Sequence, residues 1–326
     1  MNNCINVITL SVYCFMGMIE YFLIRYSKLH SYNYDNITMV IVVELSKLLV
    51  CILIYGLTTH RFLLLDMTSR NNLKHGIFYL VPAFVYACYN NFTYYNLANV
   101  DPSTFQIIMQ SRLVITALLL YIFCRKIIII EKWLALILLI IGIIIKNYQY
   151  VHLNDFSVLT SIFFQASLSS IASVYNEQLY KSDIRTSIYL QNGYLYLFGT
   201  IFNMLFSLVS YKQLTINAVR VSNSEWNTIT IGIILCNIFV GLSASFIIKY
   251  LDSLVKNIYS TLEISLTAIL TVIIFKINYN WIDILSCLIV SMSILLYSFS
   301  SKQTFRIYNS VPDILKSKKY PECIEV

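Results

Sequence analysis

The chain has 326 residues, of which 58% are hydrophobic and only 12% charged, and its mean hydropathy is +0.70. This composition excludes an ordinary soluble globular domain. The formal net charge of +7 would suit a protein that binds nucleic acid, but the basic residues follow a different pattern, that of membrane topology.

Apolar segments of about 20 residues follow one another along the chain, and each is long enough to cross a bilayer core as one helix. They lie at 5–24, 38–57, 76–97, 102–123, 127–146, 156–178, 187–210, 227–248, 252–275 and 280–300. No stretch between them is long enough for a soluble domain. We therefore predict an all-α polytopic membrane protein with ten transmembrane helices in a lipid bilayer.

The basic residues predict an orientation. If the N-terminus is cytosolic, the cytosolic segments carry 14 Lys and Arg and the opposite side carries six. Such an excess follows the positive-inside rule. We expect both termini in the cytosol, no nucleic-acid partner, and a disordered cytosolic tail at 301–326.

One apolar segment occurs twice. Residues 97–124 reappear in altered form at 248–275, an offset of 151 residues. Chance resemblance between apolar helices is the alternative, but several polar residues match at the same offset. These matches are Asp101 with Asp252, Thr116 with Thr267, and Arg112 with Glu263.

Pairing the spans at this offset divides the chain into two repeats of five spans, 1–148 and 149–300. Because five is an odd number, the second repeat must enter the membrane from the opposite side. Inverted repeats of this kind are typical of transporters, which bind their solute near the middle of the membrane between the repeats. Asp101, followed by Pro102, is expected to cap the start of the fourth span.

Charged side chains within spans are costly and need partners, water or a ligand. Glu44 and Lys47 lie three residues apart and can form an ion pair on one helix face, either as a structural staple or as a gate. Arg112 has no acidic residue three or four positions away on its own helix, and Lys256 has only Asp252, which we expect to cap the start of that helix. They suit an anionic substrate such as phosphate, although Glu263 or Glu44 could neutralise Arg112 from a neighbouring helix.

Polar side chains at helical spacing favour a hydrated cavity for a polar ligand, although such stripes also occur in plain helix packing. They are Tyr79, Tyr86, Asn90 and Thr93 in the third span; Gln165, Ser169 and Ser173 in the sixth; Tyr189, Asn192, Tyr196, Thr200 and Asn203 in the seventh; and Lys256, Ser260, Glu263, Thr267 and Thr271 in the ninth.

The sequence offers no motif for catalysis or for a cofactor. It has no histidine within a predicted span, no G-x-S-x-G motif and no glycine-rich phosphate loop. The eight cysteines form neither a disulfide framework on the far side nor a C-x-x-C metal motif. We expect no enzyme activity, no metal and no cofactor.

Several segments resemble nucleotide-sugar transporters of the drug/metabolite transporter superfamily, on the branch with CMP-sialic acid and UDP-galactose carriers. The resembling segments are ELSKLL (44–49), VYACYNN (85–91), LANVDPSTFQIIMQSR (97–112), ITAL (115–118), EKWLAL (131–136), SVYNEQLYK (173–181), LQN (190–192) and IIKYLDSLVKN (247–257). The resemblance extends through residue 300.

The resemblance implies two inverted five-helix repeats and exchange of a nucleotide sugar for its nucleoside monophosphate in the Golgi membrane, with the endoplasmic reticulum as the alternative and a homodimer as a possible assembly. It places a set of side chains around the substrate, with the two cations on phosphate: Tyr86, Asn90, Arg112, Asn192, Tyr196 and Lys256. Departures from the family pattern leave the sugar open: Arg112 replaces a usual lysine, Phe105 a common tyrosine and Gln191 a common arginine.

We therefore predict an antiporter of a pyrimidine nucleotide sugar, either UDP-galactose-like or a CMP-sugar. Ser169 and Ser260 are further candidate contacts, and Glu44, Lys47 and Glu263 are candidates for a gate or helix ion pair. A carrier of the same fold for another anion, such as a sugar phosphate or a small metabolite, is the nearest alternative. A membrane-embedded transferase is disfavoured, because it would need a carboxylate or histidine pair facing water. A receptor or structural protein is also disfavoured, because it would not need cations within two duplicated helices.

Overall fold

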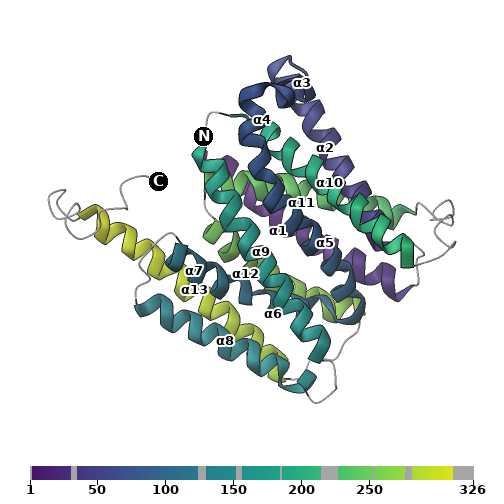
Figure 1. Cartoon of the computed structure of the whole chain (residues 1–326). Coiled ribbons are helices and arrows are strands. Elements are labelled where there is room, and N and C mark those ends of the chain that lie inside the picture. The colour runs from purple at the N-terminus through teal and green to yellow at the C-terminus, as the bar shows by residue number, and fades with distance from the viewer. Residues whose placement is uncertain are drawn as a thin grey trace.

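The computed structural model describes the chain except for residues 1, 31–34, 124–129, 152–155, 184–185, 214–226, 252, 276–280 and 311–326. Within the described residues the regular secondary structure is entirely helical (Figure 1). The longer helices are α1 (Asn2–Leu29), α2 (Asn36–Thr59), α5 (Leu80–Asn99), α6 (Pro102–Met109), α7 (Ser111–Phe123), α8 (Ile130–Val151), α9 (Phe156–Ser182), α10 (Ile188–Gln213), α11 (Thr228–Tyr250), α12 (Ser253–Phe275) and α13 (Trp281–Ser310). The short helices α3 (Leu63–Thr68), α4 (Arg70–Gly76) and η1 (Ile77–Tyr79) lie between α2 and α5.

Each predicted span corresponds to one long helix, with two exceptions. The third span also includes η1 and the last residue of α4, and the fourth is divided into α6 and α7 at Gln110. Five segments among the described residues are long and apolar enough to cross a membrane. They are Asn36–Thr59, Pro102–Ile122, Ser157–Ser182, Ile188–Val209 and Thr228–Tyr250. The chain is thus an all-helical protein with membrane-spanning helices, while the count of ten crossings and the orientation of the termini stay predictions.

Helix ends follow local capping chemistry. Asp35 accepts a hydrogen bond from the backbone N–H of Thr38 at 2.9 Å and so caps α2. Asp101 caps α6 in the same way, through Thr104 at 2.9 Å, with Pro102 at the first helical position. Such caps satisfy backbone donors that have no partner within the helix. The predicted capping role of Asp101 is confirmed.

The last helix differs from expectation. The predicted tail begins at 301, whereas α13 continues to Ser310. Residues 301–310 contain neither glycine nor proline, so nothing in them interrupts the helix. The remainder of the predicted tail, 311–326, lies outside the described residues.

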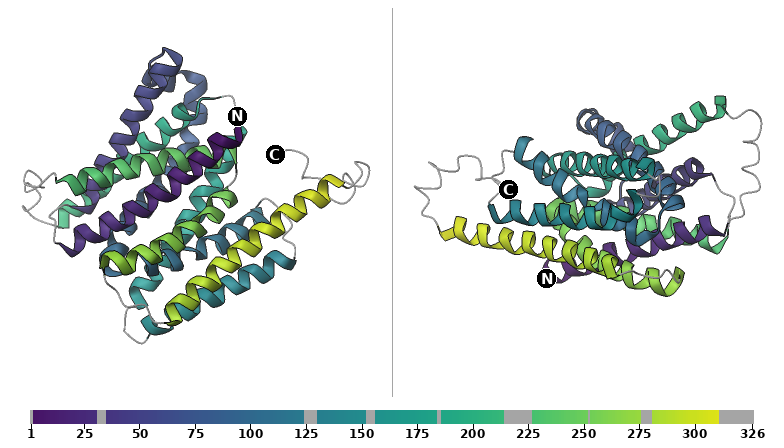
Figure 2. Two further views of the ribbon diagram at one scale, coloured as in Figure 1. Left: turned by 180° about the vertical axis from the view of Figure 1, so that it is seen from behind. Right: turned by 90° about the horizontal axis from the view of Figure 1, so that it is seen from below.

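The helices pack in pairs that are distant in sequence. The most extensive contacts join α8 with α13, α1 with α11, α2 with α10, and α5 with α9. Figure 1 shows α8 and α13 side by side at one edge of the molecule and α2 with α10 at the other. The reverse view in Figure 2 shows α1 and α11 running alongside each other between these edges.

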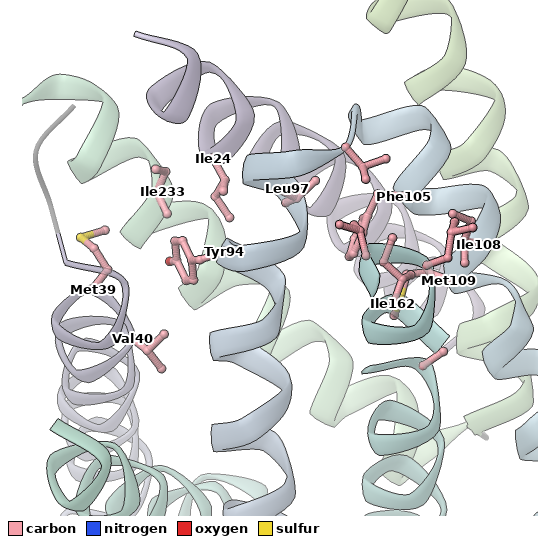
Figure 3. Packing of buried hydrophobic residues seen from close by; sticks show 14 residues of the cluster. Ile24, Met39, Val40, Tyr94, Leu97, Phe105, Ile108, Met109, Ile162 and Ile233 are labelled. Carbon is pink, nitrogen blue, oxygen red and sulfur yellow. The ribbon is translucent and has the colours of Figure 1, made fainter. Parts of the chain in front are cut away.

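A hydrophobic cluster joins the central helices. It includes Ile24 of α1, Tyr94 of α5, Phe105 of α6, Ile162 of α9 and Ile233 of α11, all nearly inaccessible to solvent. Figure 3 shows these side chains converging from their separate helices. Because this cluster holds α1, α5 and α11 together, it also fixes the walls of the polar cavity beside it.

Candidate functional site

A cavity of about 1060 Å³, with the space at its mouth included, lies between α1, α2, α5, α7, α9, α10 and α11. Aromatic rings and polar groups share its lining, in which the polar or charged members are Tyr13, Glu20, Tyr21, Glu44, Lys47, Tyr86, Tyr89, Asn90, Thr93, Tyr94, Arg112, Ser169, Asn176, Tyr196, Asn237 and Ser245.

Arg112 lines this cavity from α7 and is only 3% exposed. Among the described residues it forms no ion pair, and its Nε and Nη2 atoms have no hydrogen-bond partner. Its electrostatic neighbours are Tyr13, Tyr21, Tyr89 and the carboxylate of Glu263. A buried cation with unsatisfied donors is costly unless a ligand or water completes its hydrogen bonds. Its geometry suits bidentate contact with a phosphate or carboxylate.

The predicted pairing of Glu44 with Lys47 is confirmed. Lys47 Nζ lies 3.1 Å from Glu44 Oε1, and both side chains are buried in the cavity wall. Asn90 of α5 donates a further hydrogen bond to Glu44 Oε1 at 3.1 Å. This pair therefore connects α2 with α5 and is neutral as a unit. Among the described residues that line the cavity, Arg112 is thus the cation with unsatisfied donors.

The α10 and α11 wall approaches this ion pair closely. Lys47 Nζ lies 5.6 Å from the centre of the Tyr196 ring, a cation–π distance. Gly199 and Gly241 face the pair: a Cβ on Gly199 would lie 3.3 Å from Glu44 Oε2, and one on Gly241 would lie 3.0 Å from Lys47 Cε. The two glycines leave the space that the pair occupies.

The predicted polar stripes contribute unequally. From α5, Tyr86, Asn90 and Thr93 line the cavity, and Ser169 lines it from α9. In contrast, Tyr79 lies in η1, is not part of the cavity lining, and packs against the rings of Tyr180 and Tyr194. The α5 stripe thus faces the cavity from its second turn onward.

Polar side chains deeper in the same helices join α5 to α9. Gln165 Oε1 accepts a hydrogen bond from Asn96 Nδ2 at 2.7 Å, and Gln165 Nε2 donates to Thr93 Oγ1 at 2.6 Å. Gln165 therefore packs helices together rather than facing the cavity.

Two other candidate residues lie behind the cavity wall. Asn192 is fully buried and accepts a hydrogen bond from the Tyr180 hydroxyl at 2.7 Å. Glu263 of α12 is 3% exposed and accepts one from Gln106 Nε2 at 2.7 Å. Neither lines the cavity, so direct substrate contact by Asn192 and gating by Glu263 stay predictions. Lys256 and Ser260 lie in α12, but their side chains are outside the described residues.

The cavity also contains groups that the sequence did not single out. Glu20 of α1 is 8% exposed, lines the cavity and lies beside Asn237 of α11. Tyr13 and Tyr21 belong to the same face of α1. An acidic residue within the first predicted span was a visible signal, but only tertiary packing shows that its carboxylate shares a chamber with Arg112.

The sequence matches the family model described as "Nucleotide-sugar transporter" over residues 1–298. It is 30% identical over 312 residues to the UDP-galactose transporter senju of Drosophila melanogaster, covering 83% of this chain and 80% of that protein. It is 26% identical over 312 residues to CMP-sialic acid transporter 3 of Oryza sativa subsp. indica, covering 88% and 76%.

A shorter match, 32% identical over 236 residues, relates it to CMP-sialic acid transporter 2 of Arabidopsis thaliana, covering 69% of this chain and 56% of that protein. Among solved structures, one crystal structure has a TM-score of 0.56 at 12% identity and covers 90% of this chain and 99% of its own. At that identity the likeness concerns the fold alone.

Proposed function

Because this chain belongs to the nucleotide-sugar transporter family, we propose that it exchanges a pyrimidine nucleotide sugar for the matching nucleoside monophosphate across the Golgi membrane. The observation that carries this proposal is Arg112, a buried guanidinium with two unsatisfied nitrogen atoms in a cavity lined by aromatic and polar groups. The substrate class comes from the names of the relatives, which are UDP-galactose and CMP-sialic acid transporters. Both of these nucleotide sugars carry a pyrimidine base.

Phosphate is the part of such a substrate that Arg112 is suited to bind. A planar guanidinium can donate two parallel hydrogen bonds to phosphate oxygens, and the interaction is stronger away from bulk water. The tyrosine rings of the cavity, among them Tyr86 and Tyr196, offer flat apolar surfaces for a base, and Asn90 and Ser169 offer polar groups for ribose. Lys256 is proposed as a second phosphate ligand, from the duplicated helix.

The packing of the helices supports the proposed division into repeats at 1–148 and 149–300. If the repeats correspond, the contact of α1 with α11 should have a counterpart in the contact of α9 with α5, and both are extensive. Helices α2 and α10 are the second helices of the two repeats, and α8 and α13 are the fifth. Exchanging the repeats therefore leaves the α2–α10 and α8–α13 contacts unchanged, and these contacts too are extensive. This reciprocity is what a two-fold relation between inverted repeats would produce.

Exchange, rather than one-way transport, follows from the same cation. An empty cavity that closes would remove from water a guanidinium whose Nε and Nη2 atoms have no hydrogen-bond partner among the described residues, which costs several kcal/mol. A bound phosphate would neutralise the charge and allow the repeats to rock to the opposite opening. Each crossing would therefore require either the nucleotide sugar or the nucleoside monophosphate in the cavity.

Reconstitution into liposomes tests the proposal. Vesicles preloaded with UMP or CMP should take up labelled UDP-galactose or CMP-sialic acid, and empty vesicles should not. Uptake that neither monophosphate stimulates or competes for would contradict the proposal. If a sugar phosphate or another anion competed instead, the same fold would carry a different metabolite.

The proposed orientation places both termini in the cytosol and the exchanged sugar in the Golgi lumen. Epitope tags at each end, probed after selective permeabilisation of the plasma membrane, should both be accessible to antibody. Co-staining with Golgi and endoplasmic reticulum markers separates the two locations.

A further inference from the structure

We propose that Glu20 makes this cavity selective for nucleotide sugars whose sugar is uncharged, a specificity role that rests on the proposed transport function. The carboxylate would accept hydrogen bonds from sugar hydroxyls and repel a sugar that carries its own carboxylate. The cavity would thus have two unlike ends, a cationic one for phosphate and an anionic one for the sugar.

The surroundings of Glu20 leave its charge available to a guest. The side chain is 8% exposed and contributes to the cavity lining. Its neighbour Asn237 offers a neutral amide. Lys47 also lies near, but its Nζ atom is 3.1 Å from Glu44 Oε1 and already has a carboxylate partner. Within the described part of the chain, no ion pair includes Glu20.

The electrostatic neighbours of Glu20 differ from those of Arg112. Glu20 has Lys47, Asn237 and Glu263, whereas Arg112 has Tyr13, Tyr21, Tyr89 and Glu263. Both side chains line the same cavity. A guest whose phosphate contacts Arg112 would therefore meet Glu20 with a part that adjoins the phosphate.

The sugar fits this position better than the base does. A carboxylate accepts several hydrogen bonds and donates none. A neutral hexose presents several hydroxyl donors on adjacent carbons, whereas uracil presents a single ring N–H. Pairing Glu20 with the sugar therefore satisfies more of its acceptor capacity within a buried site, where unsatisfied groups are costly.

An acidic sugar would meet a like charge at the same place. Two carboxylates about 5 Å apart repel by about 3 kcal/mol at the effective dielectric constant of a partly buried site, which corresponds to about 100-fold in affinity. Specificity by repulsion of this kind is common where attraction alone discriminates poorly. Glu20 thus favours a neutral sugar such as galactose over an acid such as sialic acid.

A matched pair of substrates tests the inference. UDP-galactose and UDP-galacturonic acid differ only at C6 of the sugar, where a hydroxymethyl group is replaced by a carboxylate. Both are offered to liposomes that hold UMP and the wild-type protein, the Glu20→Gln variant or the Glu131→Gln control. Glu131 is an exposed acid at the start of α8 and loses the same charge.

Wild type and Glu131→Gln should prefer UDP-galactose by at least about tenfold in uptake efficiency. Glu20→Gln should reduce that preference at least about fivefold, with the uptake of each substrate expressed relative to UMP–UMP exchange by the same variant. An unchanged preference in Glu20→Gln would overturn the role of Glu20 and leave the transport function standing. Absence of UDP-sugar and UMP exchange in wild type would overturn the proposed function itself.

Discussion

Glu44 and Lys47 form a buried ion pair one turn apart on α2, with 3.1 Å between Oε1 and Nζ, in the wall of the candidate cavity. Asn90 of α5 donates a hydrogen bond to the same Glu44 oxygen. The pair therefore stabilises the α2–α5 contact only while both charges are present, because either charge alone would be buried without compensation.

Lys47→Met should consequently destabilise the protein by about 3–5 kcal/mol, and Glu44→Gln by a similar amount. The double variant should recover most of the loss, since it removes both charges together. Thermal unfolding of the purified protein in detergent measures the three variants against wild type. Additive losses in the double variant would contradict a coupled pair.

Arg112→Ala should weaken UMP binding by about 10- to 100-fold, the loss expected for one or two hydrogen bonds to a charged group. Arg112→Lys should retain part of the affinity, because it keeps the charge but loses the bidentate geometry. Equilibrium binding of labelled UMP to detergent-solubilised protein provides the measurement. Lys74→Ala removes an exposed cation from α4 and serves as the control, with unchanged affinity expected. Equal affinity in Arg112→Ala would remove the phosphate assignment.

Much of this architecture could be predicted from the sequence because its signals are local. Apolar length located the helices, Asp101 with Pro102 marked the start of α6, and the three-residue spacing of Glu44 and Lys47 marked their pairing. The division at Gln110 could not be predicted, since neither proline nor glycine occurs there and the i+3 hydrogen bonds around it depend on packing.

The site was predictable only in part. Arg112 was found because a lone charge within a span is a strong signal, and Tyr86 and Asn90 because they fall at helical spacing in a polar stripe of the third span. The orientation of each helix about its own axis decides the rest, and that orientation is set by neighbouring helices. Asn192 therefore lies behind the wall, while Glu20 faces the cavity.

Gln165 provides a prediction about the α5–α9 interface. Gln165→Leu would leave the Asn96 amide, at 2.7 Å from Gln165 Oε1, and the Thr93 hydroxyl, at 2.6 Å from Nε2, without this partner in a buried site. The free energy of unfolding should fall by about 1–3 kcal/mol for a buried group left unsatisfied. Ser167→Ala, on the same helix, removes a hydroxyl that donates to the Phe163 carbonyl oxygen within α9. This variant should leave the free energy of unfolding nearly unchanged. Equal melting temperatures for both variants would argue against the network.

Gly142 sets how closely α8 approaches α13. A Cβ at this position would lie 2.7 Å from Val290 Cγ2 and 3.3 Å from the Val290 backbone nitrogen. Small residues allow such close contact between helices in membranes. Gly142→Ala should therefore force the helices apart and reduce the free energy of unfolding by about 1–3 kcal/mol, the usual cost of overpacking.

A second substitution distinguishes this clash from a simple change in helix propensity. Val290→Ala removes the nearest methyl group, so the double variant should be more stable than the sum of the two single losses predicts. Gly56→Ala is the matched control on α2, because its Cβ would meet only the Arg61 carbonyl oxygen at 3.9 Å. It should match or exceed wild-type stability, since alanine is the better helix former. Melting temperatures of the four variants in one detergent provide the test, and a Gly142→Ala variant as stable as Gly56→Ala would show that α8 and α13 pack less closely than the structure indicates.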